Sequence, residues 1–240
     1  MSNGIKNEIF NKLKGNSSLF SFLMNILSDS TVYLFGGAIR DYLNGELDYS
    51  RDLDFVIDSG NGVSIDISKY IAGFTDVSYK TNRFNGYKIK FRNYIDIDIW
   101  NLNDTWAFKN DKLYPSAENL IKSVYLNIDA LVYSLNQDIF LNNCDVKYSQ
   151  IKKDRMLDIV FDETPYEELN LLRALVFHKK YSLFFSKILR KRLLHYYNSD
   201  QNIAVYRLME LQKEHYNTVL LNKYDLISIF NDLNLVSFHD

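Results

Sequence analysis

Two groups of residues near the start of the chain have types and spacing suited to chemistry on phosphates. Gly36 and Gly37 lie where a strand-like segment ends and a helical one begins, and Asp52 and Asp54 follow on the next strand. A glycine turn at a helix N-terminus presents backbone N–H groups to an anion. Carboxylates two apart on a strand project from one face and can share hard cations. The combination predicts a site for a phosphate and a divalent metal.

A second carboxylate pair, Asp96 and Asp98, occurs in "YIDIDIW" at residues 94–100. The alternation places both carboxylates on one strand face with Trp100, and the isoleucines on the other. The alternative for this pair is a solvated strand face, because an exposed edge strand has the same pattern. Beside Asp52 and Asp54, the segment supplies a third carboxylate, for which Asp96 is our first choice and Asp98 the other.

These are the parts needed for nucleotidyl transfer. Carboxylates can hold two Mg²⁺ ions, one to activate an attacking hydroxyl and one to stabilise the α-phosphate and the leaving pyrophosphate. The glycine amides can bind the triphosphate, and Arg40 lies between the two motifs. The alternative for the glycines is a tight turn that serves packing alone.

The joined motifs resemble those of a known family. "GGAIRDYLNG" followed by "RDLDFVI" is similar to the GG-x-x-R-D and D-x-D motifs of class II tRNA nucleotidyltransferases and bacterial poly(A) polymerases, within the DNA polymerase β superfamily. The resemblance implies that the glycines cradle an NTP and that the arginine neutralises its triphosphate. The positions implied to be catalytic and metal-binding are Asp52, Asp54 and Asp96, and those implied to bind the nucleotide are Gly36, Gly37, Arg40, Asp41, Glu167, Asn170 and Arg173.

The resemblance is fainter along the rest of the chain. "NLIKSVYLNIDALVY" lies where the family has Arg-Arg-Asp before a "TINAL"-like helix, and only residues 129–131 match. "YEELNLLRALVF" resembles the neck segment Glu-Asp-x-x-Arg followed by Arg-Ala, whose side chains read the base of the incoming nucleotide. Glu167 and Asn170 replace the family's Asp and Arg, whereas Arg173 matches. Altered base choice is therefore implied, and little sequence remains for the body and tail that grip a tRNA elbow.

Apolar periodicity predicts how these motifs are held. We expect two short helices over 5–28, a strand at 31–35, a short helix ending near Gly45 and a strand at 53–58. A helix at 62–74, strands at 76–80, 86–91 and 94–100, and a helix at 118–135 follow, and beyond about 145 every segment has helical spacing. The expected fold is α+β: a polymerase-β-type head with a mixed sheet (1–145), then an all-helical neck-like domain (146–240).

Composition limits the function classes. The 240 residues are 47% hydrophobic with a formal net charge of -2, so RNA contact would need a local basic patch. The run from His178 to His195 is one candidate, with a solvated helix face backed by Phe184 and Phe185 as the alternative. Trp106 and Phe108 are candidates for base stacking or for the core. A lone cysteine and the lack of a long apolar run favour a cytoplasmic protein without a membrane segment.

We therefore expect a Mg²⁺-dependent nucleotidyltransferase that transfers NMP from an NTP to an acceptor hydroxyl, with an RNA 3′ end, such as that of tRNA, as the first expectation. A protein or small-molecule acceptor is an alternative, and a protein partner is allowed for. A nucleotide-binding regulatory protein that has lost the chemistry is the alternative from another functional class.

Overall fold

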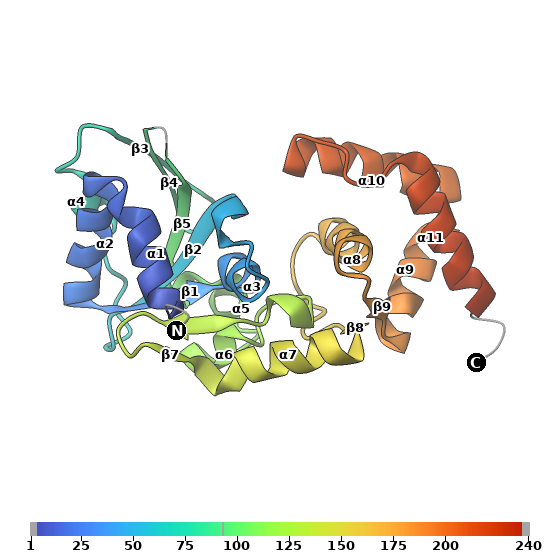
Figure 1. The fold of residues 1–240 in the computed structure, drawn as a ribbon, viewed down its shortest axis with the longest axis horizontal. Helices are drawn as coiled ribbons and strands as arrows, with labels where there is room; N and C mark the ends of the chain where they lie inside the picture. Colours follow the sequence, from blue (N-terminus) through green and yellow to red (C-terminus); the bar gives the residue numbers. More distant parts are fainter. Residues whose placement is uncertain (1–3, 93, 237–240) are drawn as a thin grey trace. The chain divides into compact units, whose positions relative to one another are not determined.

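The computed structural model describes residues 4–92 and 94–236, and its elements are labelled in Figure 1. The chain forms two compact units, Met1–Val124 with Asp129–Lys147 and Tyr125–Ile128 with Tyr148–Asp240. Helix α7 (Cys144–Asp154) begins in the first unit and ends in the second. The domain boundary expected between residues 145 and 146 falls inside this helix, and the division into two domains there stays a prediction.

A mixed sheet of seven strands organises the first unit, in the order β3-β4-β5-β2-β1-β6-β7. β2 and β5 are parallel, and every other neighbouring pair is antiparallel. The strands are β1 (Thr31–Phe35), β2 (Asp52–Asp58), β3 (Val77–Thr81), β4 (Tyr87–Phe91), β5 (Asp96–Asn101), β6 (Val132–Ser134) and β7 (Ile139–Phe140). The mixed sheet and the five strands expected before residue 101 are confirmed.

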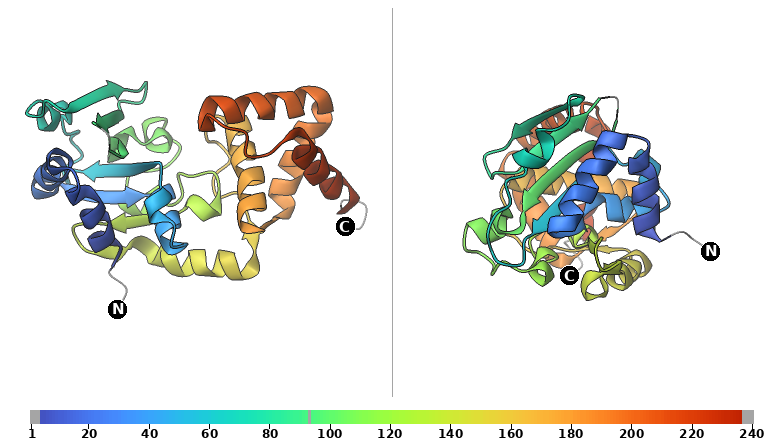
Figure 2. Two further views of the ribbon diagram at one scale, coloured as in Figure 1. Left: turned by 45° about the horizontal axis from the view of Figure 1, so that its top comes forward. Right: turned by 90° about the vertical axis from the view of Figure 1, so that its left-hand side faces the viewer.

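One face of this sheet is apolar and is covered by helices. Leu53, Ile89 and Ile97 are completely buried, as their alternation with polar neighbours requires. Phe22 of α2 contacts Phe91 of β4, with ring centroids 5.9 Å apart. Figure 2 shows α1 (Ile5–Lys14) and α2 (Ser17–Asp29) beside the strands, which confirms the two short helices expected there.

The helix expected over 62–74 is mostly wrong. Only α4 (Ser68–Ile71) is helical. Asn101 at the end of β5 accepts a hydrogen bond from the Ile65 N–H (2.7 Å) and donates to the Ile65 carbonyl (3.0 Å). These bonds fix the backbone of the segment before α4 in a loop, because they occupy groups that a helix would use.

The helix expected over 118–135 is also wrong. It is replaced by α6 (Ala117–Leu120), turns, and strand β6, which pairs with β1 and then with β7. Val132 and Tyr133 are of the β-branched and aromatic types that favour strands, and the free edge of β1 offers their backbone a partner. This long-range pairing overrides the local helical spacing.

The second unit is mostly helical. Its helices after α7 are α8 (Glu167–Tyr181), α9 (Lys187–Ser199), α10 (Gln201–Tyr216) and α11 (Lys223–Val236). The expectation of helices alone fails at one point. The short strand β8 (Met156–Leu157), before α8, pairs in parallel with β9 (Phe184–Phe185), which lies between α8 and α9. The chain turns there because Ser182 adopts a left-handed conformation with φ 54°. Within the described residues, no helix is long and apolar enough to cross a membrane.

Gln212 closes the link between α10 and α11. Its side chain is completely buried, accepts hydrogen bonds from the N–H groups of Leu220 (2.9 Å) and Leu221 (2.7 Å), and donates to the Leu221 carbonyl (3.0 Å). A buried amide that satisfies three backbone groups stabilises one loop conformation, because each group would be costly to bury without a partner.

The turn from β1 into α3 (Gly37–Leu43) requires glycine at its first position. Gly36 has φ 63° and ψ -114°, outside the regions that residues with a side chain favour. A Cβ on Gly36 would lie 3.9 Å from the Asp129 carbonyl oxygen, an ordinary contact, so backbone conformation and not space demands glycine. Gly37, in the helix, has no positive φ, and a Cβ there would lie 3.6 Å from Arg40 Nη2.

We predict that Gly36→Ala lowers the free energy of unfolding by about 1–3 kcal/mol through backbone strain. Gly37→Ala is the matched control and should change stability by less than about 1 kcal/mol, because alanine favours the helix. Denaturant unfolding followed by circular dichroism measures both. Equal stability of the two variants would contradict the conformational role of Gly36.

Candidate active site

Parallel pairing of β2 with β5 gathers the carboxylates. Asp52 lies opposite Asp96, and Asp54 lies opposite Asp98. Neighbouring strands lie about 4.8 Å apart and residues two apart share a face, so all four project from the same side. That side is opposite the apolar face that packs on α2. β5 lies between β4 and β2 in the interior of the sheet, so Asp96 and Asp98 do not lie on an edge strand, although their face can still be solvated.

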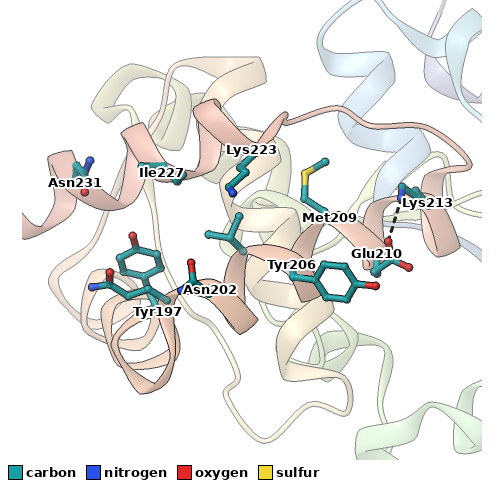
Figure 3. Close-up of a pocket in the computed structure, with 11 residues that line it drawn as sticks. Tyr197, Asn202, Tyr206, Met209, Glu210, Lys213, Lys223, Ile227 and Asn231 are labelled. Carbon is teal, nitrogen blue, oxygen red and sulfur yellow. Dashed lines mark hydrogen bonds and ion pairs between the residues drawn. The ribbon is translucent and has the colours of Figure 1, made fainter.

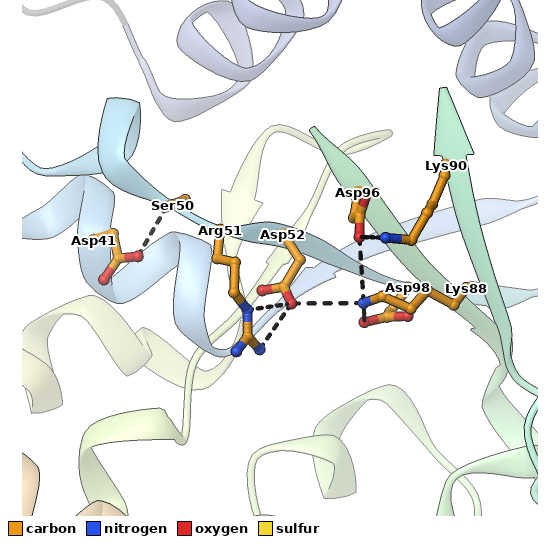
Figure 4. A network of polar contacts seen from close by, with 8 residues as sticks. All are labelled: Asp41, Ser50, Arg51, Asp52, Lys88, Lys90, Asp96 and Asp98. Atoms are coloured by element: carbon orange, nitrogen blue, oxygen red, sulfur yellow. Dashed lines mark hydrogen bonds and ion pairs between the residues drawn. The ribbon is translucent and has the colours of Figure 1, made fainter. Parts of the chain in front are cut away.

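Cations pair with this carboxylate face (Figure 4). Lys88 Nζ lies 3.0 Å from Asp98 Oδ2, 3.8 Å from Asp96 Oδ2 and 3.9 Å from Asp52 Oδ2. Lys90 Nζ lies 3.1 Å from Asp96 Oδ2. On the other side, Arg51 donates to Asp52 Oδ2 from Nε at 3.0 Å, and its Nη2 lies 2.9 Å from the same oxygen. The carboxylates therefore repel one another less than their spacing alone would suggest.

The electrostatics of the face shift the pKa values of two of its groups, Lys88 and Asp98. Partial burial by itself lowers the pKa of Lys88, but the hydrogen bond to Asp98 and the charges of Asp98, Asp52 and Asp96 outweigh it, so this pKa is raised. Burial raises the pKa of Asp98, and the charges of Asp52 and Asp96 add to that effect against the opposing influence of Lys88. The face thus favours positive charge, the property that a cation site requires.

The carboxylates fit Mg²⁺ in the chemistry of their donor atoms. Carboxylate oxygens are hard ligands of the kind that Mg²⁺ takes, and three of them already surround the ammonium group of Lys88. In the part of the chain that the structure describes, no group of three or more His, Cys, Asp or Glu side chains is already arranged to hold a metal ion. Metal ligation by Asp52, Asp54 and Asp96 therefore stays a prediction.

Arg40 is held in place by two carboxylates. Its Nη1 donates to Asp129 Oδ1 at 2.5 Å, and its Nη2 donates to Asp41 Oδ1 at 3.1 Å. The second oxygen of Asp41 accepts a hydrogen bond from Ser50 Oγ at 2.8 Å. Asp129 is only 5% exposed, so its charge needs compensation from within the protein, and Arg40 supplies a positive charge beside it. Asp41 links α3 to the residues before β2, and Asp129 links α3 to the segment before β6.

The glycine turn lies at the start of α3, and the backbone amide of Gly36 already donates a hydrogen bond. The Gly36 N–H donates to the Leu131 carbonyl at 2.9 Å. The amides of the first turn of α3, beginning with Gly37, have no acceptor within the helix. Triphosphate binding by the two glycines stays a prediction, with Gly37 the better placed of the pair.

The three neck positions share α8 in the second unit. Glu167, Asn170 and Arg173 follow one another at intervals of three and lie on one side of the helix. Asn170 donates to Thr164 Oγ1 at 2.9 Å and to the Pro165 carbonyl at 3.2 Å, which ties the preceding loop to α8. Glu167 lies 3.7 Å from Arg192 Nη1. Arg173 lies over the ring of Phe177, 5.8 Å from its centre.

The other candidates divide between surface and core. Lys187, Lys191 and Arg192 are exposed on α9, and RNA contact by the run from His178 to His195 stays a prediction. The solvated-face alternative places Phe184 in the core, which is wrong: Phe184 is 55% exposed and lies beside the guanidinium of Arg155. Phe108 is buried in the core.

Several cavities of the described residues contain aromatic side chains, and two of them bear on the candidates above. Trp106 lines one of about 200 Å³ in the first unit, together with Trp100 and Phe84. A groove of about 750 Å³ in the second unit lies between α10 and α11 (Figure 3). Tyr197 and Tyr206 line the groove, whose residues include none of the sequence-predicted site positions.

Sequence reasoning missed Lys88, Lys90 and Arg51. Lys88 and Lys90 are two apart in "GYKIKF", a spacing that puts both on one face of β4. Cations in register with an acidic neighbouring strand are a recognisable signal, but only if the β4–β5 hairpin is known to pair Lys88 with Asp98 and Lys90 with Asp96. The pairing of Arg40 with Asp129 has no local signal at all.

No protein-family model and no curated protein matches this sequence. Its fold, however, is similar to that of solved structures. A CCA-adding enzyme in complex with CTP superposes with a TM-score of 0.64 at 14% identity, covering 98% of this chain and 56% of that chain. The Thermotoga maritima CCA-adding enzyme complexed with tRNA-CCA gives 0.62 at 15% identity, covering 96% and 54%.

A tRNA nucleotidyltransferase complexed with a primer tRNA and an incoming ATP analog gives a TM-score of 0.59 at 17% identity, covering 90% of this chain and 61% of that chain. This protein thus spans little more than half the length of the structures it matches. The likeness shows that the chain has the fold of a nucleotidyltransferase head followed by a helical neck.

Proposed function

We propose that this protein transfers NMP from an NTP to an acceptor hydroxyl, with an RNA 3′ end, tRNA foremost, as the acceptor. The observation that carries the proposal is the register of β2 with β5, which places Asp52 opposite Asp96 on one face of the sheet. That face occurs in a fold shared with CCA-adding enzymes, whose solved complexes contain CTP, ATP and tRNA.

In this reaction the acceptor oxygen attacks the α-phosphorus of the NTP. A new P–O bond forms, the bond to the β-phosphate oxygen breaks, pyrophosphate leaves and the attacking hydroxyl loses its proton. We assign Asp52, Asp54 and Asp96 to hold Mg²⁺, which when bound supplies Lewis-acid polarisation and a lowered hydroxyl pKa. Asp98 lies beside them and contributes negative charge to the same face.

Triphosphate binding is assigned to the β1–α3 turn. Gly36 sets the direction of the turn and Gly37 begins the helix whose N-terminus favours an anion. Arg40 supplies positive charge, and Asp41 and Asp129 orient its guanidinium. An arginine pre-oriented by carboxylates loses little side-chain entropy on binding a phosphate.

Base choice is assigned to the neck positions Glu167, Asn170 and Arg173. A guanidinium offers a rigid fork of donors, whereas the amide of Asn170 offers one acceptor and two donors on a short stem. Asn170 also holds Thr164 and Pro165. We therefore infer that this chain selects its nucleotide differently from enzymes with an Arg at this position.

A second function is favoured by the ion pairs of the carboxylate face. Lys88, Lys90 and Arg51 supply cations to Asp52, Asp96 and Asp98 from within the chain. Such a face suits a protein that binds a nucleotide as a signal and does not turn it over. Transfer to a protein or small molecule is the remaining alternative for an active enzyme.

We predict that Asp52→Asn and Asp54→Asn each lower nucleotide transfer about a hundredfold or more, because a metal ligand is lost. Both variants should melt within about 3 °C of the wild type, because removal of one negative charge also relieves repulsion within the crowded carboxylate face. Asp58→Asn, on the same strand, is the control. The assay incubates each protein with labelled NTPs, Mg²⁺ and total RNA.

Label in RNA at the wild-type level for Asp52→Asn would refute the metal assignment. Label in the protein fraction would identify a protein acceptor. If wild-type protein binds NTP by calorimetry but transfers none of it to RNA, protein or small molecules, the regulatory function replaces the enzymatic one.

A double variant separates the structural role of Arg40 from its binding role. Arg40→Gln removes the cation that pairs with the buried carboxylate of Asp129 and should lower the free energy of unfolding by about 3 kcal/mol. Adding Asp129→Asn removes the charge of that carboxylate and should restore most of the loss. If Arg40 contacts the triphosphate, both variants should bind ATP about tenfold or more weakly than the wild type. Calorimetric titration showing wild-type ATP affinity in the stable double variant would make Arg40 purely structural.

We predict that this protein does not add C, C and A in order to tRNA. Glu167 and Asn170 occupy the positions at which the family that the sequence resembles has Asp and Arg. Given tRNA that lacks its 3′ C-C-A, with CTP and ATP, it should add a different or single nucleotide, or none. Sequencing of the product ends checks this. Ordered addition of C, C and A would overturn the inference about base choice, while leaving nucleotidyl transfer established.

A further inference from the structure

Lys88 occupies the centre of the carboxylate face. It extends from β4, lies opposite Asp98 of β5 in the sheet register, and its ammonium group also lies within 3.9 Å of oxygens of Asp96 and of Asp52 on β2. Lys90, on the same face of β4, contacts Asp96 alone among these carboxylates in the described ion pairs. The two lysines therefore differ in reach although they share a strand and a face.

The side chain of Lys88 extends across β5 to contact Asp52 on β2. β4 and β2 are two sheet spacings apart, about 10 Å, so contact between Lys88 and Asp52 requires both side chains to lean over the intervening strand. The ammonium group lies where the negative charge of three carboxylates is shared. A divalent cation is attracted to the same oxygens for the same reason.

We propose that Lys88 is a positioning residue that holds Asp52, Asp96 and Asp98 together in the metal-free protein and competes with a divalent cation for Asp52 and Asp96. This inference rests on the proposed function of the same site. Binding of the cation displaces the ammonium group toward Asp98, its nearest partner. Lys88 thereby lowers metal affinity in the absence of nucleotide, and the negative charge of an NTP triphosphate offsets its effect when the two bind together.

Binding of Mn²⁺ tests the competition directly. Electron paramagnetic resonance titration of free Mn²⁺ gives the affinity of wild-type protein, Lys88→Met, Lys88→Gln and the matched control Lys90→Met, each without and with ATP. Removal of a positive charge that lies within 3.9 Å of oxygens of Asp52 and Asp96 should tighten Mn²⁺ binding about tenfold in both Lys88 variants without ATP. Lys90→Met should have a smaller effect, because Lys90 pairs with one carboxylate of the face.

A measurement on the wild-type chain keeps the inference testable if the variants fold poorly. Amine labelling followed by mass spectrometry reports how accessible each lysine is. Mn²⁺ should raise the labelling rate of Lys88 severalfold and leave that of Lys213, which pairs with Glu210 in the second unit, unchanged. A Lys88 rate that is insensitive to bound Mn²⁺ would overturn the proposal.

The outcomes separate this inference from the proposed function. If wild-type protein binds Mn²⁺ and the Lys88 variants bind it equally well, Lys88 does not compete and nucleotidyl transfer still stands. If Lys90→Met tightens binding as much as Lys88→Met, general charge and not the position of Lys88 is responsible, which also overturns it. If no protein binds Mn²⁺ even with ATP, the metal assignment fails and this inference fails with it.

Discussion

Parallel pairing of β2 with β5 is the constraint on which the candidate site depends. It sets Asp52 opposite Asp96 and Asp54 opposite Asp98, so two short sequence motifs that are far apart in the chain become one acidic face. A shift of either strand by one residue would turn its carboxylates into the apolar layer beneath α2. The buried Leu53 and Ile97 prevent that shift, because they would then face solvent. Core packing and site geometry are thus specified by the same register.

Repulsion within the acidic face opposes folding, and positive charges on neighbouring elements offset it. Carboxylates this close destabilise a sheet unless positive charge lies near them. Lys88 and Lys90 on β4 and Arg51, immediately before β2, provide that charge. On the other side of β2, Arg40 has the same function toward Asp129 and Asp41. The chain therefore balances the acidic groups locally, which explains how a protein with a formal net charge of -2 maintains a concentrated acidic surface.

The sequence predicts the parts of this arrangement that local pattern controls. The alternation in "YIDIDIW" and the glycines at the start of α3 place the carboxylates and the turn correctly, because strand parity and the conformational freedom of glycine act within a few residues. The segment 118–135 is mispredicted, because pairing of β6 with β1 decides its structure. The partners of Arg40 and Lys88 are missed for the same reason: Asp129 and Asp52 reach them only after the sheet has formed.

The central claim is that this acidic face binds divalent metal together with a nucleoside triphosphate. Crystals grown with Mn²⁺ and a non-hydrolysable ATP analogue, measured at the manganese absorption edge, locate both ligands in one experiment. The account predicts anomalous density at the carboxylates of Asp52 and Asp54, with the triphosphate extending toward Gly37 and Arg40. Triphosphate bound elsewhere, or bound at the turn with no manganese at these carboxylates, would contradict it.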